Sequence, residues 1–222
     1  MNVICRIMGR GFNVGLPGKN MALVGEIPII ARVVAETVKC GWINKTYVWT
    51  EDYAIAEAAK SVGAEVIHRD LDEVFYNGGF NDPNNWGRIM DQHIESDIGK
   101  PDVVVTLNCN YALITKATLT AMFTKLMEHE SAAAITAIVP VDPGLVTINP
   151  QTGYIFPVWL QSGLDRQKYP PLYRITGIRI QHHGRNDIHG FGLKELWYEI
   201  GKIEGLDVQT EDDLKLANYF VE

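Results

Sequence analysis

Strand-like and helix-like segments alternate through the first two thirds of this 222-residue chain. Short apolar runs are each followed by a segment whose apolar residues recur at helical spacing. The expected strands are residues 3–7, 45–50, 64–68, 103–107 and 133–139, and the expected helices are residues 29–39, 52–61, 86–95 and 116–129. Because such alternation produces a mostly parallel sheet covered by helices on both faces, the sequence predicts an α/β fold.

The pattern changes near Pro140. Residues 140–173 contain six of the ten prolines, so hairpins and loops are expected there instead of helical crossovers. Such a segment can protrude to make a dimer contact, although its composition fits a plain surface excursion equally well. A strand pattern returns at residues 175–181, and residues 211–221 are expected to form a helix capped by Thr210. We predict a single domain over residues 1–222.

Composition excludes several classes of protein. Hydrophobic residues make up 46% of the chain and charged residues only 21%, which favours a sizeable core over disorder. The net charge of −7 opposes a role in coating nucleic acid. Cys5, Cys40 and Cys109 lie far apart in or beside apolar runs, as expected of reduced core residues. The N-terminus does not resemble a signal peptide, and no apolar run approaches ~20 residues, so we expect a cytoplasmic protein without a membrane partner.

A glycine-rich loop, residues 7–20, separates the first expected strand from the first expected helix. Glycines let the backbone approach a ligand and direct several N–H groups toward it, and cations neutralise phosphate charge. The loop contains four glycines and two cations: Gly9, Gly11, Gly15, Gly18, Arg10 and Lys19. An ordinary surface loop is the alternative, but the combination favours phosphate binding.

The loop matches neither of the commonest phosphate-binding patterns. In the P-loop the Gly-Lys pair precedes serine or threonine, whereas Gly18-Lys19 precedes Asn20 here. The dinucleotide fingerprint needs a third glycine where this chain has Val14. Both patterns are disfavoured.

Three loops are expected to meet at one edge of the sheet. Ligand sites in open parallel sheets lie beyond the carboxyl ends of the strands. Residues 8–20, 50–53 and 108–114 each follow an expected strand. Their convergence there supports a nucleotide site.

Five segments of the chain resemble one enzyme family in the same order. The loop Arg10-Gly-Phe-Asn-Val-Gly-Leu-Pro-Gly-Lys-Asn20 is similar to Arg-Gly-Gly-Ser-Lys-Gly-Ile-Pro-x-Lys-Asn, and Arg166-Gln-Lys-Tyr-Pro-Pro-Leu-Tyr173 to Arg-Gln-x-x-Pro-Pro-x-Tyr. Leu206-Asp-Val-Gln-Thr-Glu-Asp-Asp-Leu214 is similar to Ile-Asp-Ile-Asp-Thr-Glu-Glu-Asp-Leu, and residues 48–66 and 108–114 complete the set. These segments resemble the sugar-acid cytidylyltransferases, which include the synthetases of CMP-N-acetylneuraminate and CMP-3-deoxy-manno-octulosonate.

The resemblance implies a fold, a reaction and partners. The fold would be the Rossmann-like nucleotide-diphospho-sugar transferase fold, with a small protruding dimerisation segment at residues 140–173. The reaction would couple CMP from CTP to an acidic acceptor, such as a 2-keto sugar acid, and release pyrophosphate. The acceptor oxygen would attack the α-phosphorus in line, with Mg²⁺ across the phosphates and no covalent enzyme intermediate. The protein would be a homodimer.

The resemblance also implies roles for particular residues. Those expected to bind nucleotide are Gly9, Arg10, Gly11, Asn13, Lys19, Asn20, Asn85 and Asn110. Those expected to contact the acceptor are Asn108, Arg166, Gln167 and Tyr173. Those expected to act in catalysis are Arg10, Lys19 and Asp207, and the metal would be met by Asp207 and, weakly, by Gln209. Arg166 can clamp a carboxylate with two parallel hydrogen bonds, although a plain surface arginine is the alternative.

The departures from the family pattern fall near the expected pocket. Asn110 stands where octulosonate enzymes carry a metal-binding aspartate, and Gln209 replaces the second aspartate of the tail motif. Because Mg²⁺ prefers carboxylate oxygens, its binding is expected to depend on the triphosphate, with Asp207 as the main protein carboxylate. A simpler interpretation is that Asp207 only caps the last helix or binds a neighbouring residue.

Two other functions are consistent with these departures. One is a catalytically impaired, nucleotide-binding regulatory protein. The other is a cytidylyltransferase for a non-sugar acid such as a phosphonate, because Asn108 replaces a longer glutamine on the acceptor side.

Overall fold

We analysed a computed structural model that describes residues 1–13, 15–69, 86–141, 146–157, 171–185 and 194–221. Seven strands form one sheet in the order β11-β7-β10-β6-β1-β4-β5. Their bounds are β1 Val3–Met8, β4 Lys45–Thr50, β5 Glu65–His68, β6 Val103–Asn108, β7 Ala134–Val141, β10 Leu172–His182 and β11 Glu195–Glu199. The predicted mostly parallel sheet is confirmed: only β10 runs antiparallel, and it does so against both of its neighbours, β6 and β7.

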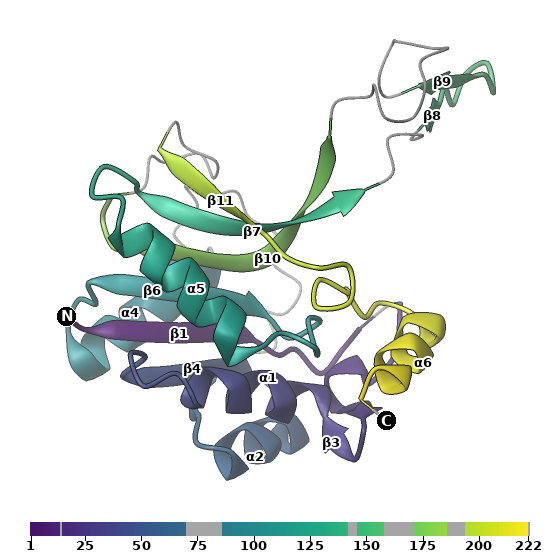
Figure 1. The fold of residues 1–222 in the computed structure, drawn as a ribbon. Helices are drawn as coiled ribbons and strands as arrows, with labels where there is room; N and C mark the ends of the chain where they lie inside the picture. The colour runs from purple at the N-terminus through teal and green to yellow at the C-terminus, as the bar shows by residue number, and fades with distance from the viewer. Residues whose placement is uncertain (14, 70–85, 142–145, 158–170, 186–193, 222) are drawn as a thin grey trace.

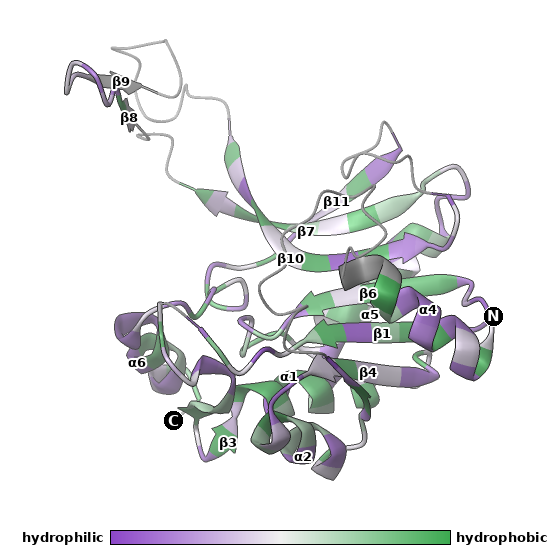
Figure 2. Ribbon diagram, turned by 180° about the vertical axis from the view of Figure 1, so that it is seen from behind, coloured by the Kyte–Doolittle hydropathy of each residue, from purple (hydrophilic) through white to green (hydrophobic). Residues whose placement is uncertain are grey.

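Helices cover both faces of the sheet (Figures 1 and 2). The helices are α1 Ile29–Val38, α2 Tyr53–Ser61, α4 Trp86–Ile98, α5 Lys116–Met127 and α6 Glu211–Tyr219, together with the short 3-10 helix η1 Lys19–Met21. Asp52 caps α2, Thr115 caps α5, and Thr210 forms a capping box with Asp213 at the start of α6. The predicted Thr210 cap is therefore confirmed.

Alternating side chains along the central strands build two hydrophobic layers. Cys5 and Ile7 on β1 belong to the layer under α1, α2 and α5, whereas Ile4 belongs to the layer under α4. The same alternation on β6 puts Val105 in the first layer and Val104 in the second. Because both faces of these strands are buried, apolar residues occupy successive positions along each strand instead of alternating with polar ones. Each fully buried aliphatic side chain contributes about 1.5–3 kcal/mol to folding.

Two short hairpins complete the fold. β2 Leu23–Val24 pairs with β3 Ile27–Pro28 between η1 and α1. β8 Val146–Ile148 pairs with β9 Ile155–Pro157 and lies apart from the main sheet (Figure 1). The second hairpin falls within the segment predicted to protrude, while its contact with a second copy stays a prediction.

The topology brings distant segments to one edge of the sheet. β10 is antiparallel to both β6 and β7, so the carboxyl ends of β1, β4, β6 and β7 share that edge. The segments that follow β1 and β6 meet residues 205–210, which precede α6, at this edge. None of the helices in the described ranges has the length and apolar character needed to cross a membrane.

Candidate active site

The first half of the glycine-rich loop packs against the start of α2. The Gly11 N–H donates to Glu51 Oε1 at 2.7 Å, and a Cβ on residue 11 would lie 2.6 Å from Asp52 Oδ2. Asp52 is held there by capping α2, so a larger residue at position 11 must displace it. The Asn13 side-chain amide donates to the Arg10 carbonyl oxygen at 3.2 Å. Two predicted phosphate donors, the Gly11 N–H and the Asn13 amide, thus already have protein partners.

The second half of the loop turns inward and buries two polar residues. Gly18 has a φ of +67°, a left-handed conformation that favours glycine and begins the turn into η1. Lys19 and Asn20 then follow with exposed fractions of only 6% and 2%. Asn20 Nδ2 donates to the Arg10 carbonyl oxygen at 2.7 Å, while the Cys109 thiol donates to Asn20 Oδ1 at 2.8 Å. These contacts join the loop after β1 to the end of β6.

The Cys109 thiol is neutral in this setting. Burial raises its pKa to about 12, although the nearby Lys19 ammonium acts in the opposite direction. A neutral thiol can donate its hydrogen to Asn20, as the contact requires. Burial also lowers the pKa of Lys19, which the neighbouring Asp207 opposes.

Lys19 begins a line of polar contacts that ends on β10. Lys19 Nζ donates to Gln209 Oε1 at 2.8 Å, and Gln209 Nε2 donates to Asp207 Oδ1 at 2.8 Å. Asp207 Oδ2 lies 3.7 Å from Arg174 Nη1. The structure therefore brings together three residues predicted from the sequence and adds Arg174. The cap of α6 is made by Thr210 with Asp213, so Asp207 does not cap that helix. Its contacts with Gln209 and Arg174 fit the other simple interpretation, that Asp207 binds neighbouring residues.

The predicted asparagines after β6 lie beside this line. The Asn110 carbonyl oxygen accepts a hydrogen bond from the Val208 N–H at 3.0 Å. Asn108 packs against β10, where a Cβ on Gly177 would lie 2.2 Å from Asn108 Nδ2. The close approach of these strands at position 177 requires glycine.

Tyr111 was not among the predicted site residues. Its hydroxyl accepts a hydrogen bond from the Gly177 N–H at 3.1 Å and one from Arg174 Nη1 at 3.3 Å. Arg174 Nη2 also donates to the Gly205 carbonyl oxygen at 2.7 Å. Burial raises the pKa of Tyr111, which keeps it a neutral phenol. Tyr111 lies within the 108–114 loop that the sequence singled out, but nothing local distinguishes it from its neighbours.

A hollow of about 480 Å³ opens beside Asp207 at the carboxyl end of β7. Its charged lining consists of two cations and two carboxylates, Arg174, Lys202, Asp207 and Asp213. Asp213 is occupied by the cap of α6, and Arg174 by the contacts described above. Lys202 is exposed and has no ion-pair or hydrogen-bond partner among the described residues. The hollow therefore offers an ammonium group that a ligand can contact, within a charged lining that is balanced overall.

Tyr173 lies elsewhere. Successive side chains of a strand point to opposite faces, so Tyr173 and Arg174 diverge. The Tyr173 ring stacks on Trp197 of β11 with a centroid distance of 6.4 Å, and 39% of Tyr173 is exposed. Its predicted contact with the acceptor stays a prediction. Asn85, Arg166 and Gln167 lie outside the described residues.

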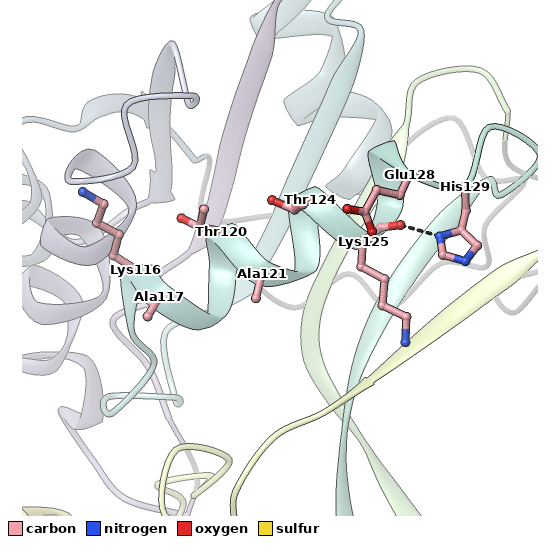
Figure 3. Close-up of a pocket in the computed structure, with 8 residues that line it drawn as sticks. All are labelled: Lys116, Ala117, Thr120, Ala121, Thr124, Lys125, Glu128 and His129. Atoms are coloured by element: carbon pink, nitrogen blue, oxygen red, sulfur yellow. Dashed lines mark hydrogen bonds between the residues drawn. The ribbon is translucent and has the colours of Figure 1, made fainter.

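Two other hollows adjoin different parts of the fold. One, of about 790 Å³, follows α5 from Lys116 to His129, and Figure 3 shows that its residues all come from this helix and the turn after it. It contains none of the predicted site residues. The other, of about 290 Å³, includes Glu51, whose Oε2 is buried without a partner in the described part of the chain. Glu51 connects this smaller hollow to the glycine-rich loop.

The expected metal position contains few suitable groups. Among the described residues no group of three or more His, Cys, Asp or Glu side chains could hold a metal ion. Asp207 is the carboxylate nearest Lys19 in the line of contacts, and it is already engaged by Gln209 and Arg174. Divalent magnesium binds through oxygen ligands, commonly including one or two carboxylates. The groups in the described ranges do not by themselves form such a site.

Comparison with known sequences shows which proteins this chain is similar to. Residues 6–75 match a family model described as cytidylyltransferase. The 3-deoxy-manno-octulosonate cytidylyltransferase of Thioalkalivibrio sulfidiphilus is 26% identical over 204 residues, which are 91% of this chain and 77% of the relative. The 8-amino-3,8-dideoxy-manno-octulosonate cytidylyltransferase of Shewanella loihica is 26% identical over 129 residues, 58% of this chain. That second match spans about half of the relative, 49% of its length.

Solved structures show the same fold. A CMP:2-keto-3-deoxy-manno-octonic acid synthetase complexed with CTP superimposes with a TM-score of 0.71 at 14% identity, covering 100% of this chain and 98% of the other. A 4-diphosphocytidyl-2C-methyl-D-erythritol synthase from Anaerococcus prevotii gives 0.66 at 9% identity, covering 99% and 98%. The fold is thus that of nucleotidyltransferases. The resemblance of this chain to the sugar-acid cytidylyltransferase family is confirmed by the sequence matches.

Proposed function

We propose that this protein transfers CMP from CTP to an acidic acceptor and releases pyrophosphate. The observation that carries the proposal is the buried Lys19 ammonium, which the glycine-rich loop and residues 207–209 hold at the carboxyl edge of the sheet. A fixed cation at this place suits a triphosphate, because phosphoryl transfer is governed by positioning and by charge stabilisation on the phosphate oxygens. The cytidylyltransferase relatives support CTP as the nucleotide.

The nucleotide would lie along the loop after β1. Arg10 is exposed at the start of this loop, and Lys19 is buried at its end, so the two cations can bracket the phosphates. Gly9, Gly11, Asn20 and Asn110 line the same edge and retain their predicted contacts with nucleotide as proposals. The Gly11 and Asn13 donors would have to exchange their present protein partners for phosphate oxygens.

The acceptor would enter through the hollow beside Asp207. Lys202 and Arg174 supply positive charge there, which suits a carboxylate, and the volume of about 480 Å³ is large enough for a small acid. A 2-keto sugar acid is the proposed class, in agreement with the substrates for which the relatives are named. The proposed contacts with the acceptor remain Asn108, Arg166, Gln167 and Tyr173.

The transfer would proceed by one in-line displacement. An acceptor hydroxyl oxygen bonds to the α-phosphorus as the bond from that phosphorus to the pyrophosphate oxygen breaks. The hydroxyl would transfer its proton to the carboxylate of Asp207, which lines the hollow and lies 3.7 Å from Arg174 Nη1. Lys19 stabilises charge on the phosphates during the displacement.

We propose that Mg²⁺ enters with the triphosphate and that Asp207 is its main protein contact, with Gln209 a weak one. When bound, the ion would neutralise charge on the phosphate oxygens. We further propose a cytoplasmic homodimer in which residues 140–173 contact the second copy. The projecting β8–β9 hairpin is consistent with that contact (Figure 1).

A second candidate function is nucleotide binding without transfer. It is favoured by the amides at positions 110 and 209 and by the internal partners of Gly11 and Asn13, which together leave the site with few groups committed to catalysis. A transferase that uses a phosphonate acceptor is a third.

Pyrophosphate release separates these functions. The protein would be incubated with CTP, Mg²⁺ and a panel containing 3-deoxy-manno-octulosonate, its 8-amino analogue, N-acetylneuraminate and a phosphonate. We expect release with a keto-sugar acid and little release when UTP or ATP replaces CTP. CTP binding without release from any acceptor would support the binding protein instead, and release with the phosphonate alone would support the third function.

A further inference from the structure

The Lys19 ammonium group has capacity left for a ligand. An ammonium has three N–H donors, and Lys19 Nζ makes one hydrogen bond among the described residues, to Gln209. The residue as a whole is 94% buried, since its exposed fraction is 6%. A buried charge with unused donors is costly unless an anion meets it. This cation is therefore poised to accept an anionic group.

Gln209 holds Lys19 through an amide whose orientation is determined at both ends. Its Oε1 accepts from the Lys19 ammonium at 2.8 Å, and its Nε2 donates to the Asp207 carboxylate at 2.8 Å. A flipped amide would place NH₂ against the ammonium and carbonyl oxygen against the carboxylate, losing both hydrogen bonds. The loop also approaches Gln209 closely, because a Cβ on Gly15 would lie 3.0 Å from the Gln209 carbonyl oxygen. Gln209 thus links Lys19 to Asp207.

The charge at this place favours an anion over a divalent cation. The line of contacts contains two cations, Lys19 and Arg174, and one carboxylate, Asp207, for a net charge of +1. Aspartate at both 110 and 209 would make it −1, and a divalent ion would restore +1. With amides at 110 and 209, the site therefore has a net charge of +1 without metal. A variant with two aspartates would reach the same charge only when a divalent ion is bound.

We infer that Gln209 is a positioning residue that presents Lys19 as the resident cation of the site, so that the nucleotide-free protein holds no divalent ion there and binds the triphosphate group without metal. This deepens the proposed function, because it assigns the triphosphate contact within the same site. It does not depend on whether transfer follows binding.

Metal binding to the nucleotide-free protein tests the first part of the inference, that this site holds no divalent ion. Mn²⁺ would be titrated by electron paramagnetic resonance into the natural protein, into Asn110→Asp/Gln209→Asp, and into Gln151→Asp, which adds one carboxylate at an exposed turn. We expect the double variant to bind Mn²⁺ at least about tenfold more tightly than the natural protein and Gln151→Asp to leave binding unchanged. Mn²⁺ binding by the natural protein that Asp207→Asn abolishes would overturn the inference.

Nucleotide binding in excess EDTA tests the second part of the inference, that the site binds a triphosphate group without metal. CTP and inorganic tripolyphosphate would be titrated calorimetrically into the natural protein, Gln209→Leu, Lys19→Met and Lys100→Met. Lys100 is an exposed lysine just before β6, at the amino edge of the sheet, and serves as the matched control. Circular dichroism would confirm that each variant is folded.

In EDTA, the natural protein is expected to bind both probes. Lys19→Met should weaken binding about tenfold or more, Gln209→Leu several-fold, and Lys100→Met less than twofold, because a charge-assisted hydrogen bond is worth about one to two powers of ten in affinity. No binding of either probe in EDTA, or equal binding by Gln209→Leu, would overturn the inference. Binding in EDTA without pyrophosphate release in the presence of metal and acceptors would contradict only the proposed transfer.

Discussion

The two ends of the candidate site differ in how far they are built. At the proposed nucleotide end, Lys19, Asn20 and Cys109 are buried. The Cys109 thiol donates to Asn20, and the Lys19 ammonium donates to Gln209. At the acceptor end, the side chains of Arg174 and Asp207 are 40% and 30% exposed, and Lys202 extends into solvent.

This difference indicates that the proposed triphosphate end is preorganised, whereas the proposed acceptor end has room to vary. Side chains held by packing lose little freedom when a ligand binds, which favours tight and specific contacts. Exposed cations on a wide hollow impose weaker geometric demands. Under the proposed function, the acceptor class is therefore where this chain has most freedom to differ from its relatives.

The largest effect is expected at the nucleotide end from Lys19→Ala. Loss of the buried ammonium removes the charge proposed to stabilise the phosphates, so pyrophosphate release should fall about a hundredfold or more. Steady-state assays with CTP and the best acceptor measure this. Wild-type turnover in Lys19→Ala would show that the preorganised end does not act in the reaction.

Gly11→Ala strains the same end without removing a charge. The new methyl group would meet Asp52, so either the loop shifts or the α2 cap is lost, and stability should fall by about 1–3 kcal/mol. Urea unfolding measures the change, and CTP affinity should fall with it. Gly41→Ala is the matched control, because a Cβ there meets nothing within 4 Å. Equal stability of the two variants would mean that the loop is looser than its contacts indicate.

Lys202→Met probes the acceptor end. Removing the ammonium should raise the acceptor KM about tenfold while leaving the KM for CTP unchanged, since a charged hydrogen bond to one carboxylate is lost. Lys202→Arg should recover most of the affinity. If the CTP and acceptor constants change together, the two ends are not the separate units described here.

The smallest effect is expected at Glu36, which joins α1 to the first residue of α5. Hydrogen bonds from the Lys39 side chain and the Lys116 N–H lower the pKa of Glu36, although its burial acts in the opposite direction. A lowered folded-state pKa gives stability that is present above the ordinary value of 4.5 and is lost as the pH falls through the folded value.

Glu36→Gln should therefore cost about 0.5–1 kcal/mol at pH 7 and less near pH 3. Urea unfolding at the two pH values measures this, and catalytic constants per folded molecule should not change. A cost that is equal at both pH values would contradict the sign derived from the pKa.

Local patterns predicted most of the fold. The alternation of strands and helices, the Thr210 cap and the β10 strand were all apparent, because apolar spacing and capping chemistry act over a few residues. β11 was missed because it lies beyond the region of strand–helix alternation and two of its five residues are glutamates, a residue type that is depleted in strands. The antiparallel placement of β10 between β6 and β7 was likewise not encoded in any local pattern.

The candidate site likewise has features that the sequence predicted and features that only the tertiary structure shows. From the sequence alone came the glycine-rich loop, Lys19 within it, Asp207 and Gln209 near the C-terminus, and the resemblance to sugar-acid cytidylyltransferases. Only the tertiary structure decided that Lys19 donates to Gln209, 190 positions away, and that Arg174 meets Tyr111, 63 positions away. Local residue preferences determine turns, helices and strands, whereas contacts between distant segments depend on how the strands are ordered in the sheet. That ordering is why the residues predicted one by one became a buried nucleotide end and an open acceptor end.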